Sequence, residues 1–223
     1  MKKIAIAAAA SSLLAACATT PPPSLGSYTV DSGVARSPDQ LALSFEKADL
    51  NIRVEPKTRS IQGDARLTFG TRQPVDRIEL DLDRNLPIEA IEVDGQALAG
   101  GSWSNPEGRL TVRLPQRLEP GKQTTIRVRY RGTPHVAKNA PWDGGFVWSQ
   151  TPDGQPWVAS AVQGEGCDLF WPCIDHPTGK PKQVDQHFTV PAPLVAAGAG
   201  VAMGMDEKDG WRTWLWSTRY PST

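Results

Sequence analysis

The stretch Asp49-Leu50-Asn51-Ile52-Arg53-Val54 alternates polar and apolar side chains residue by residue. In an extended chain this alternation places Leu50, Ile52 and Val54 on one face and the polar side chains on the other, as a half-buried strand requires. The same alternation recurs in later segments, at residues 78–82, 91–93, 110–114 and 126–130. The sequence therefore predicts a sheet protein, and no pattern of period 3.6 competes with that interpretation.

Turn-forming residues follow or separate these segments. The predicted turns are Glu55-Pro56-Lys57, Ile61-Gln62-Gly63-Asp64, Asp94-Gly95, Asn105-Pro106-Glu107-Gly108 and Glu119-Pro120-Gly121-Lys122. Short strands at such spacing are typical of an antiparallel β-sandwich, so we predict an all-β fold. Near the end of the sequence, Trp211–Trp216 predicts one more strand, and Gly204-Met205-Asp206-Glu207 is interpreted as a turn.

Composition and charge exclude several classes of protein. The 223 residues leave room for one large or two small domains. The 24 basic residues are balanced by 24 acidic ones, so the chain lacks the basic surface that nucleic acids require and we expect no nucleic-acid partner. A hydrophobic content of 39% is that of a globular protein with a core, which excludes disorder throughout the chain.

The first residues predict a targeting segment. Lys2 and Lys3 precede a short apolar stretch that ends in Leu14-Ala15-Ala16-Cys17. This run resembles the lipobox of bacterial lipoproteins, which implies a signal peptide over residues 1–16 and lipidation of Cys17. Ala18 stands where an Asp would resemble an inner-membrane retention signal, so the resemblance implies an outer-membrane anchor facing the periplasm or the cell surface. A plain secretory signal is the alternative.

The domain organisation follows from a change in composition after the lipobox. Residues 17–38 comprise the lipidated Cys and a polar, Pro-rich stretch, which is typical of a spacer. Residues 39–223 contain the alternating segments and are predicted to form the β domain.

A longer motif follows the alternating segments. Within Ala161–Pro191, the matching positions in order are Gln163, Pro172-Cys173, Asp175-His176-Pro177 and Lys180. Their order and spacing closely resemble the N-terminal domain of the gluzincin zinc aminopeptidases, the family of aminopeptidase N and leukotriene hydrolase. The resemblance covers roughly residues 40–223.

The resemblance implies a function as well as a fold. The family's N-terminal domain is a saddle-like β-sandwich that precedes a zinc-binding catalytic domain, and the enzyme releases N-terminal residues from peptides. By position, Gln163 would accept a hydrogen bond from the peptide's α-ammonium group, with Gly164 and Glu165 beside it in the binding loop. The alternative for Gln163 is a plain hydrogen-bonding residue of a strand.

Three further residues of the motif are expected to be structural. Asp175, Pro177 and Lys180 would shape the loop that carries Gln163, with the Asp175 side chain closing an Asx-type turn before Pro177. Cys167 and Cys173 do not have the spacing of a common zinc site with His176. We expect two buried thiols here, and a disulfide remains open.

The sequence departs from the family at its catalytic centre. No H-E-x-x-H motif is present, and His135, His176 and His187 are its only histidines. Zinc is therefore implied for a full-length enzyme, and this chain is expected to bind none and to be inactive without its missing catalytic domain. The alternative is a non-catalytic β-sandwich lipoprotein that binds peptides or serves as an assembly surface.

Overall fold

The computed structural model describes residue 29 and residues 32–221 of the chain. The predicted signal peptide, the Cys17 lipidation site and most of the predicted linker lie outside the described residues. Within the described ranges, no helix has the length and apolar character needed to cross a membrane.

Strands dominate the described chain, and helices are short. The elements in order are α1 (Pro38–Ala42), β1 (Leu43–Glu55), β2 (Ser60–Thr71), β3 (Val75–Asp81), β4 (Ile88–Val93), β5 (Gln96–Ala97), β6 (Trp103–Ser104), the 3₁₀ helix η1 (Pro106–Gly108), β7 (Arg109–Leu118), β8 (Gln123–Gly132), β9 (Gly145–Gln150), β10 (Pro156–Ala161), the 3₁₀ helix η2 (Cys167–Leu169), β11 (Gln183–Pro191), β12 (Val201–Lys208) and β13 (Trp211–Arg219). The predicted all-β, sandwich-like fold is confirmed.

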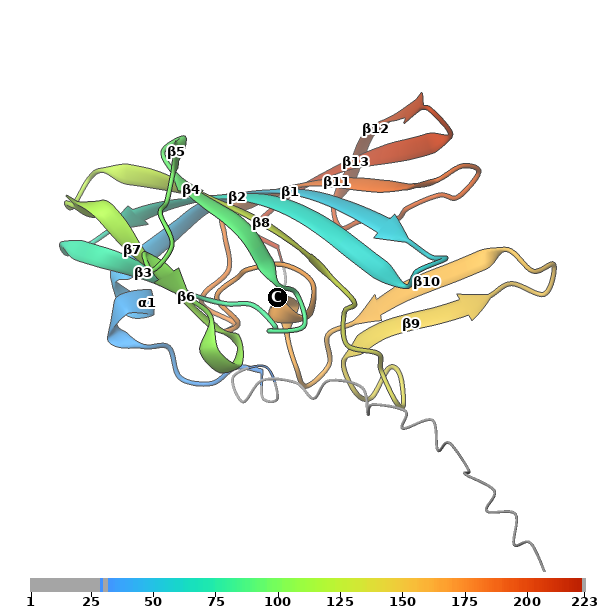
Figure 1. The fold of residues 1–223 in the computed structure, drawn as a ribbon, viewed down its shortest axis with the longest axis horizontal. Coiled ribbons are helices and arrows are strands. Elements are labelled where there is room, and N and C mark those ends of the chain that lie inside the picture. The colour runs from blue at the N-terminus through green and yellow to red at the C-terminus, as the bar shows by residue number, and fades with distance from the viewer. Residues whose placement is uncertain (1–28, 30–31, 222–223) are drawn as a thin grey trace, which may run out of the picture.

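The strands form three sheets (Figure 1). The largest has the order β12-β13-β11-β1-β2-β8-β4-β5, and β3-β7-β6 forms a second sheet that shares its core. The third is the two-stranded β9–β10 hairpin, which projects from the body at one end (Figure 1). One pairing departs from the antiparallel expectation: β1 runs parallel to β11, with Leu50 opposite Gln186.

The alternating segments bury the faces that the sequence predicts. Leu50 and Ile52 on β1 are 1% and 3% exposed, and Val54 is partly buried against the same core. Burying alternate side chains leaves the polar residues of each strand outside, so the apolar faces hold the layers together. The same core contains Ile78 of β3 and Val128 of β8, both 0% exposed.

Two predicted turns are in fact strands. Ile61–Asp64 lies inside β2, where Gly63 belongs to the inward face and pairs with Tyr130 of β8. A Cβ on Gly63 would lie 2.0 Å from Cζ of Tyr130, so the Tyr ring occupies the space that a side chain would need. The predicted turn at residues 204–207 lies in β12, because this segment pairs with β13 after a bulge between Ala202 and Gly204.

The strand predicted at Trp211–Trp216 is confirmed as part of β13. Three side chains on one of its faces donate to backbone carbonyls of residues 193–196: Arg212 Nη1 to Pro193, Trp214 Nε1 to Leu194 and Trp216 Nε1 to Ala196. These contacts satisfy the polar ends of two half-buried Trp side chains while their rings supply apolar area.

Candidate functional site

The predicted binding residue Gln163 lies in a tight turn directly after β10, at residues 162–166, which we call the binding turn. The turn is closed by a hydrogen bond from Gly166 N to Val162 O at 2.9 Å, and Gly164 and Gly166 have φ angles of 85° and 95°. Gln163 is exposed, and its side chain makes no hydrogen bond within the described residues. It is therefore not a bonded residue of a strand, and its amide is free to contact a ligand.

Glu165 fastens this turn to the segment before β9. Its Oε2 accepts a hydrogen bond from the Gly144 N–H. That segment is itself closed by Asp143, whose carboxylate accepts from the backbone N–H groups of Lys138 and Asn139, at 2.6 Å each. Glu165 thus positions the turn that carries Gln163, and it links two loops that lie about twenty residues apart along the chain.

The segment before α1 holds the other side of the turn. Ser32 N donates to Gly164 O at 2.7 Å, and Gly33 N donates to Asp175 O at 3.2 Å. Ser32 Oγ also donates to Asp175 Oδ1 at 3.1 Å. Hydrogen bonds to the site therefore begin several residues before the predicted domain boundary at residue 39.

Asp175 does not close the Asx turn that the sequence predicts. Such a turn needs the N–H two residues on, and Pro177 has none. The buried Asp175 carboxylate instead accepts from Ser32 and from Cys167 N, the latter at 3.4 Å. A Cβ on Gly166 would lie 2.1 Å from Asp175 Oδ1, which explains why glycine is needed at this point of the turn.

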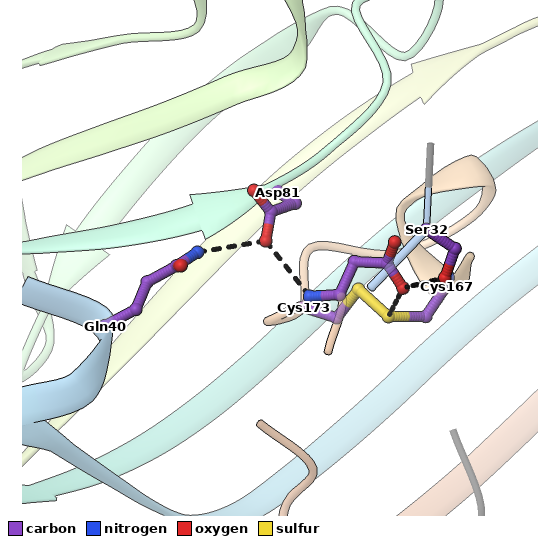
Figure 2. Close-up of a disulfide and its surroundings, with 6 residues drawn as sticks. Ser32, Gln40, Asp81, Cys167 and Cys173 are labelled. Carbon is purple, nitrogen blue, oxygen red and sulfur yellow. Dashed lines mark hydrogen bonds between the residues drawn. A yellow bond between two sulfur atoms is a disulfide. The ribbon is translucent and has the colours of Figure 1, made fainter. Parts of the chain in front are cut away.

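Cys167 and Cys173 form a disulfide, and the expectation of two free thiols is wrong (Figure 2). The bond spans η2 directly after the binding turn. Cys173 is also paired with Asp81 at the end of β3, by hydrogen bonds of 2.7 and 3.0 Å between the two backbones. The sequence leaves the pairing open because only the folded chain brings the two Cβ atoms together.

A cluster of carboxyl groups lies around the disulfide, comprising the buried Asp83, Asp168 and Asp175 and the half-buried Asp81. Asp81 Oδ2 accepts from Gln40 Nε2 and from Asp175 N, both at 3.0 Å (Figure 2). Asp168 is 0% exposed, and neither of its carboxyl oxygens has a hydrogen-bond partner of good geometry in the described chain, although the Thr29 side chain is close enough to oppose the rise of its pKa. The cluster therefore contains more buried acid than its hydrogen bonds can stabilise as carboxylate.

Burial is the main cause of the pKa shifts in this cluster. Burial, followed by the neighbouring charges of Asp175 and Asp81, raises the pKa of Asp168 to about 9. Burial also raises the pKa of Asp81 to about 6, although its hydrogen bonds from Asp175 N and Gln40 oppose the shift. The pKa values of Asp83 and Asp175 are raised for the same first reason. At neutral pH the protein holds Asp168 as a neutral acid.

Lys180 and Pro177 lie on the exposed side of the loop that follows the disulfide. Lys180 borders an apolar pocket of about 190 Å³, whose lining also includes Trp171 and Val162, the residue before Gln163 in the chain. Gly179 N donates to His176 O at 2.7 Å and turns the chain toward this pocket. Val162, the neighbour of Gln163, and Lys180 thus border the same pocket.

The described residues do not fit a zinc ion. They contain no group of three or more His, Cys, Asp or Glu side chains arranged to hold a metal. His135, His176 and His187 lie in separate parts of the fold, and the two cysteines nearest His176 are oxidised to a disulfide. We therefore derive no zinc-dependent step from this chain.

Replacing Glu165 by Ala is expected to loosen the binding turn. The loss of a hydrogen bond to a charged acceptor should lower the free energy of unfolding by about 1.5–3 kcal/mol. It should also speed amide hydrogen exchange at Gly144, measured by NMR. Glu165→Gln keeps an acceptor oxygen and should preserve most of the protection, whereas equal exchange rates in both variants would contradict the positioning role.

Three contributors to this site escape sequence analysis. Ser32, Gly144 and Asp81 lie far from Gln163 along the chain and are brought to the loop by the fold. A single sequence carries no signal for such pairs. The nearest signal is the turn-rich stretch around Asp143-Gly144, which predicts a loop but does not say which residues that loop contacts.

Known structures similar to this chain are M1 zinc metallopeptidases. An M1 zinc metallopeptidase from Deinococcus radiodurans is 28% identical to this chain, with a TM-score of 0.61. The match covers 80% of this chain and 39% of that one. A mutant of the protein from Deinococcus radiodurans bound to a Tyr-Ser-Ala substrate gives 28% identity and a TM-score of 0.63 over 86% of this chain and 42% of that one. A two-domain M1 metallopeptidase mutant bound to L-arginine gives the same values.

The likeness predicted from the motif is thus confirmed in the structure. The chain spans about two fifths of the length of these metallopeptidases. No family model matches the sequence. No curated protein matches it either.

Proposed function

From the likeness to M1 zinc metallopeptidases, we propose that this chain is the substrate-anchoring domain of a zinc metallo-aminopeptidase. In this proposal the remainder of the enzyme supplies the zinc ion and the groups that cleave the peptide bond. Cys17 carries the lipid that attaches the protein to the outer membrane, facing the periplasm or the cell surface. The observation that carries the proposal is an exposed, unbonded Gln163 on a turn that is fastened from several sides.

The Gln163 side chain can recognise a peptide by its amino end. Its amide oxygen accepts a hydrogen bond from the α-ammonium group, and an acetylated amino end has neither the charge nor the same donors. A fixed acceptor at this place sets where the peptide begins, so the first peptide bond reaches the cleaving groups. A neutral amide binds the ammonium less strongly than a carboxylate would, which makes the contact less sensitive to salt.

Replacing Gln163 by Ala in the full-length enzyme should raise KM for unblocked peptides about tenfold, the worth of one hydrogen bond to a charged group. N-blocked peptides should be affected much less, and Gln163→Glu should retain the preference for a free amine. Gln155→Ala changes another exposed glutamine in the turn between β9 and β10 and serves as the matched control. Equal changes for both classes of peptide would refute the α-amine contact.

Zinc analysis and activity assays on the native protein distinguish the aminopeptidase from the non-catalytic alternative. Protein from the native cell that contains about one zinc ion per chain and cleaves aminoacyl anilides in a chelator-sensitive manner supports the aminopeptidase. Peptide binding without zinc or turnover supports a binding lipoprotein. Radiolabelled palmitate should label the native protein, and Cys17→Ser should abolish that labelling.

A further inference from the structure

A cleft separate from the pocket beside Lys180 lies between the β9–β10 hairpin and the turn that joins β1 to β2. We name it the hairpin cleft; its volume is about 680 Å³. One wall is a single face of the hairpin, since Gln150 is paired with Pro156 and Trp148 with Val158. The opposite wall is the β1–β2 turn, with Pro56, Lys57 and Arg59.

The charge of the hairpin cleft is positive. Lys57 and Arg59 are exposed, neither makes an ion pair in the described chain, and no acidic side chain lines the cleft. Glu55 is near in sequence, and its Oε1 accepts from Lys57 N at 3.2 Å. Arg59 N also donates to Pro56 O at 3.4 Å, which closes the turn. The backbone of the turn is thus fixed, and its two exposed cations stand at the rim of a cleft that no carboxylate lines.

The Trp148 ring gives the hairpin wall its apolar character. The ring is held by stacking on Phe146, with 5.4 Å between ring centroids. Its indole N–H is buried and has no acceptor among the described residues, so a ligand in the cleft meets the ring and not the N–H.

The hairpin cleft and the binding turn are connected by one extended strand. Val158 lines the cleft, and the chain runs from it through the end of β10 to Gln163. Those five steps span at most about 18 Å at 3.6 Å per residue. An extended pentapeptide has nearly the same reach, so its two ends can lie at the two places together.

We propose that the hairpin cleft binds the carboxyl-terminal end of a peptide whose amino end is held at Gln163. Lys57 and Arg59 attract the terminal carboxylate, and the apolar faces of Trp148 and Val158 contact the residues before it. This inference rests on the proposed function and adds a second anchor, which makes peptide length a determinant of binding. Shorter peptides reach only the amino-end anchor.

The test is calorimetric titration of the full-length protein, kept free of metal by a chelator so that no peptide is cleaved. The ligands, at low salt, are pentaalanine as the free acid, as the carboxyl-terminal amide and as the N-acetylated acid. Amidation should weaken binding about fivefold, the worth of two exposed ion pairs. The variant Lys57→Gln/Arg59→Gln should bind acid and amide equally. Dialanine, which cannot span the two places, should show no effect of amidation in any variant.

Two controls separate this inference from the proposed function. Arg113→Gln/Lys122→Gln removes the same charge from exposed positions outside the cleft and should keep the preference for the free acid. N-acetylation should weaken pentaalanine binding in the native protein and in Lys57→Gln/Arg59→Gln alike, since it reports on Gln163.

Three results would overturn the inference. They are equal binding of acid and amide by the native protein, a preference for the acid that survives Lys57→Gln/Arg59→Gln, and no binding of pentaalanine at all. If N-acetylation weakens binding and amidation does not, the carboxyl-end anchor fails and the amino-end anchor stands. If amidation matters and N-acetylation does not, the amino-end anchor fails, and with it the proposed pairing of the two ends.

Discussion

Replacing Asp168 by Asn will stabilise the protein increasingly as the pH rises from 6 to 8. The native protein holds this carboxyl group with a pKa of about 9, above the ordinary value of 3.8. Between those values the unfolded chain releases a proton that the folded chain retains. Each pH unit therefore lowers the free energy of unfolding of the native protein by up to about 1.4 kcal/mol.

The asparagine variant cannot ionise in either state, so it lacks this part of the pH dependence. The difference between the two proteins should grow by about 2–3 kcal/mol between pH 6 and pH 8, with the variant gaining relative to the native protein. Urea unfolding at a series of pH values measures it directly. A difference that stays constant over this range would show that Asp168 is not neutral in the folded protein.

Asp185 provides a control of opposite sign. Burial raises the pKa of Asp185, but hydrogen bonds from Lys47, Ser217 and Gln183 outweigh it and lower the pKa to about 2. Its stabilising effect is present above the ordinary pKa and is lost as the pH falls toward about 2. Asp185→Asn should therefore destabilise the protein at neutral pH, whereas Asp168→Asn should not.

Replacing Gly63 by Ala should lower the free energy of unfolding by about 3 kcal/mol, at the upper end of overpacking in a closed core. The added methyl group would lie 2.0 Å from Cζ of Tyr130, a fully buried ring whose hydroxyl donates to Phe170 O at 2.6 Å. The ring cannot move aside without breaking that hydrogen bond beside the disulfide. Thermal and urea unfolding will measure the loss.

Gly70→Ala is the matched control in the same strand. A methyl group there meets nothing closer than 3.7 Å, so the change should be small. Combining Gly63→Ala with Tyr130→Leu removes the ring atoms that clash. The double variant should therefore lose at least about 1 kcal/mol less than the sum of the two single losses. Strict additivity would contradict the contact.

Sequence analysis predicts most of the layers because burial imposes a period of two on each strand. It fails at Ile61–Asp64 because Gly63 and Asp64 are turn formers locally, and only the Tyr130 ring reveals that Gly63 faces the core. It fails at Asp175 for another reason: Pro177 has no N–H to close an Asx turn, and the carboxylate accepts from Ser32 and Cys167 instead. The motif places Gln163 and Glu165 in one loop, and the fold alone supplies the contacts that fix this loop.

The parallel pair of β1 and β11 imposes an order on biosynthesis. Roughly 130 residues separate the end of β1 at Glu55 from the start of β11 at Gln183. At about 5–20 residues per second, a ribosome needs roughly 6–26 s to add them. During that interval one side of β1 exposes unsatisfied backbone groups, which favours aggregation or capture by a chaperone. The large sheet therefore cannot close around β1 until β11 is available, wherever in the cell the chain folds.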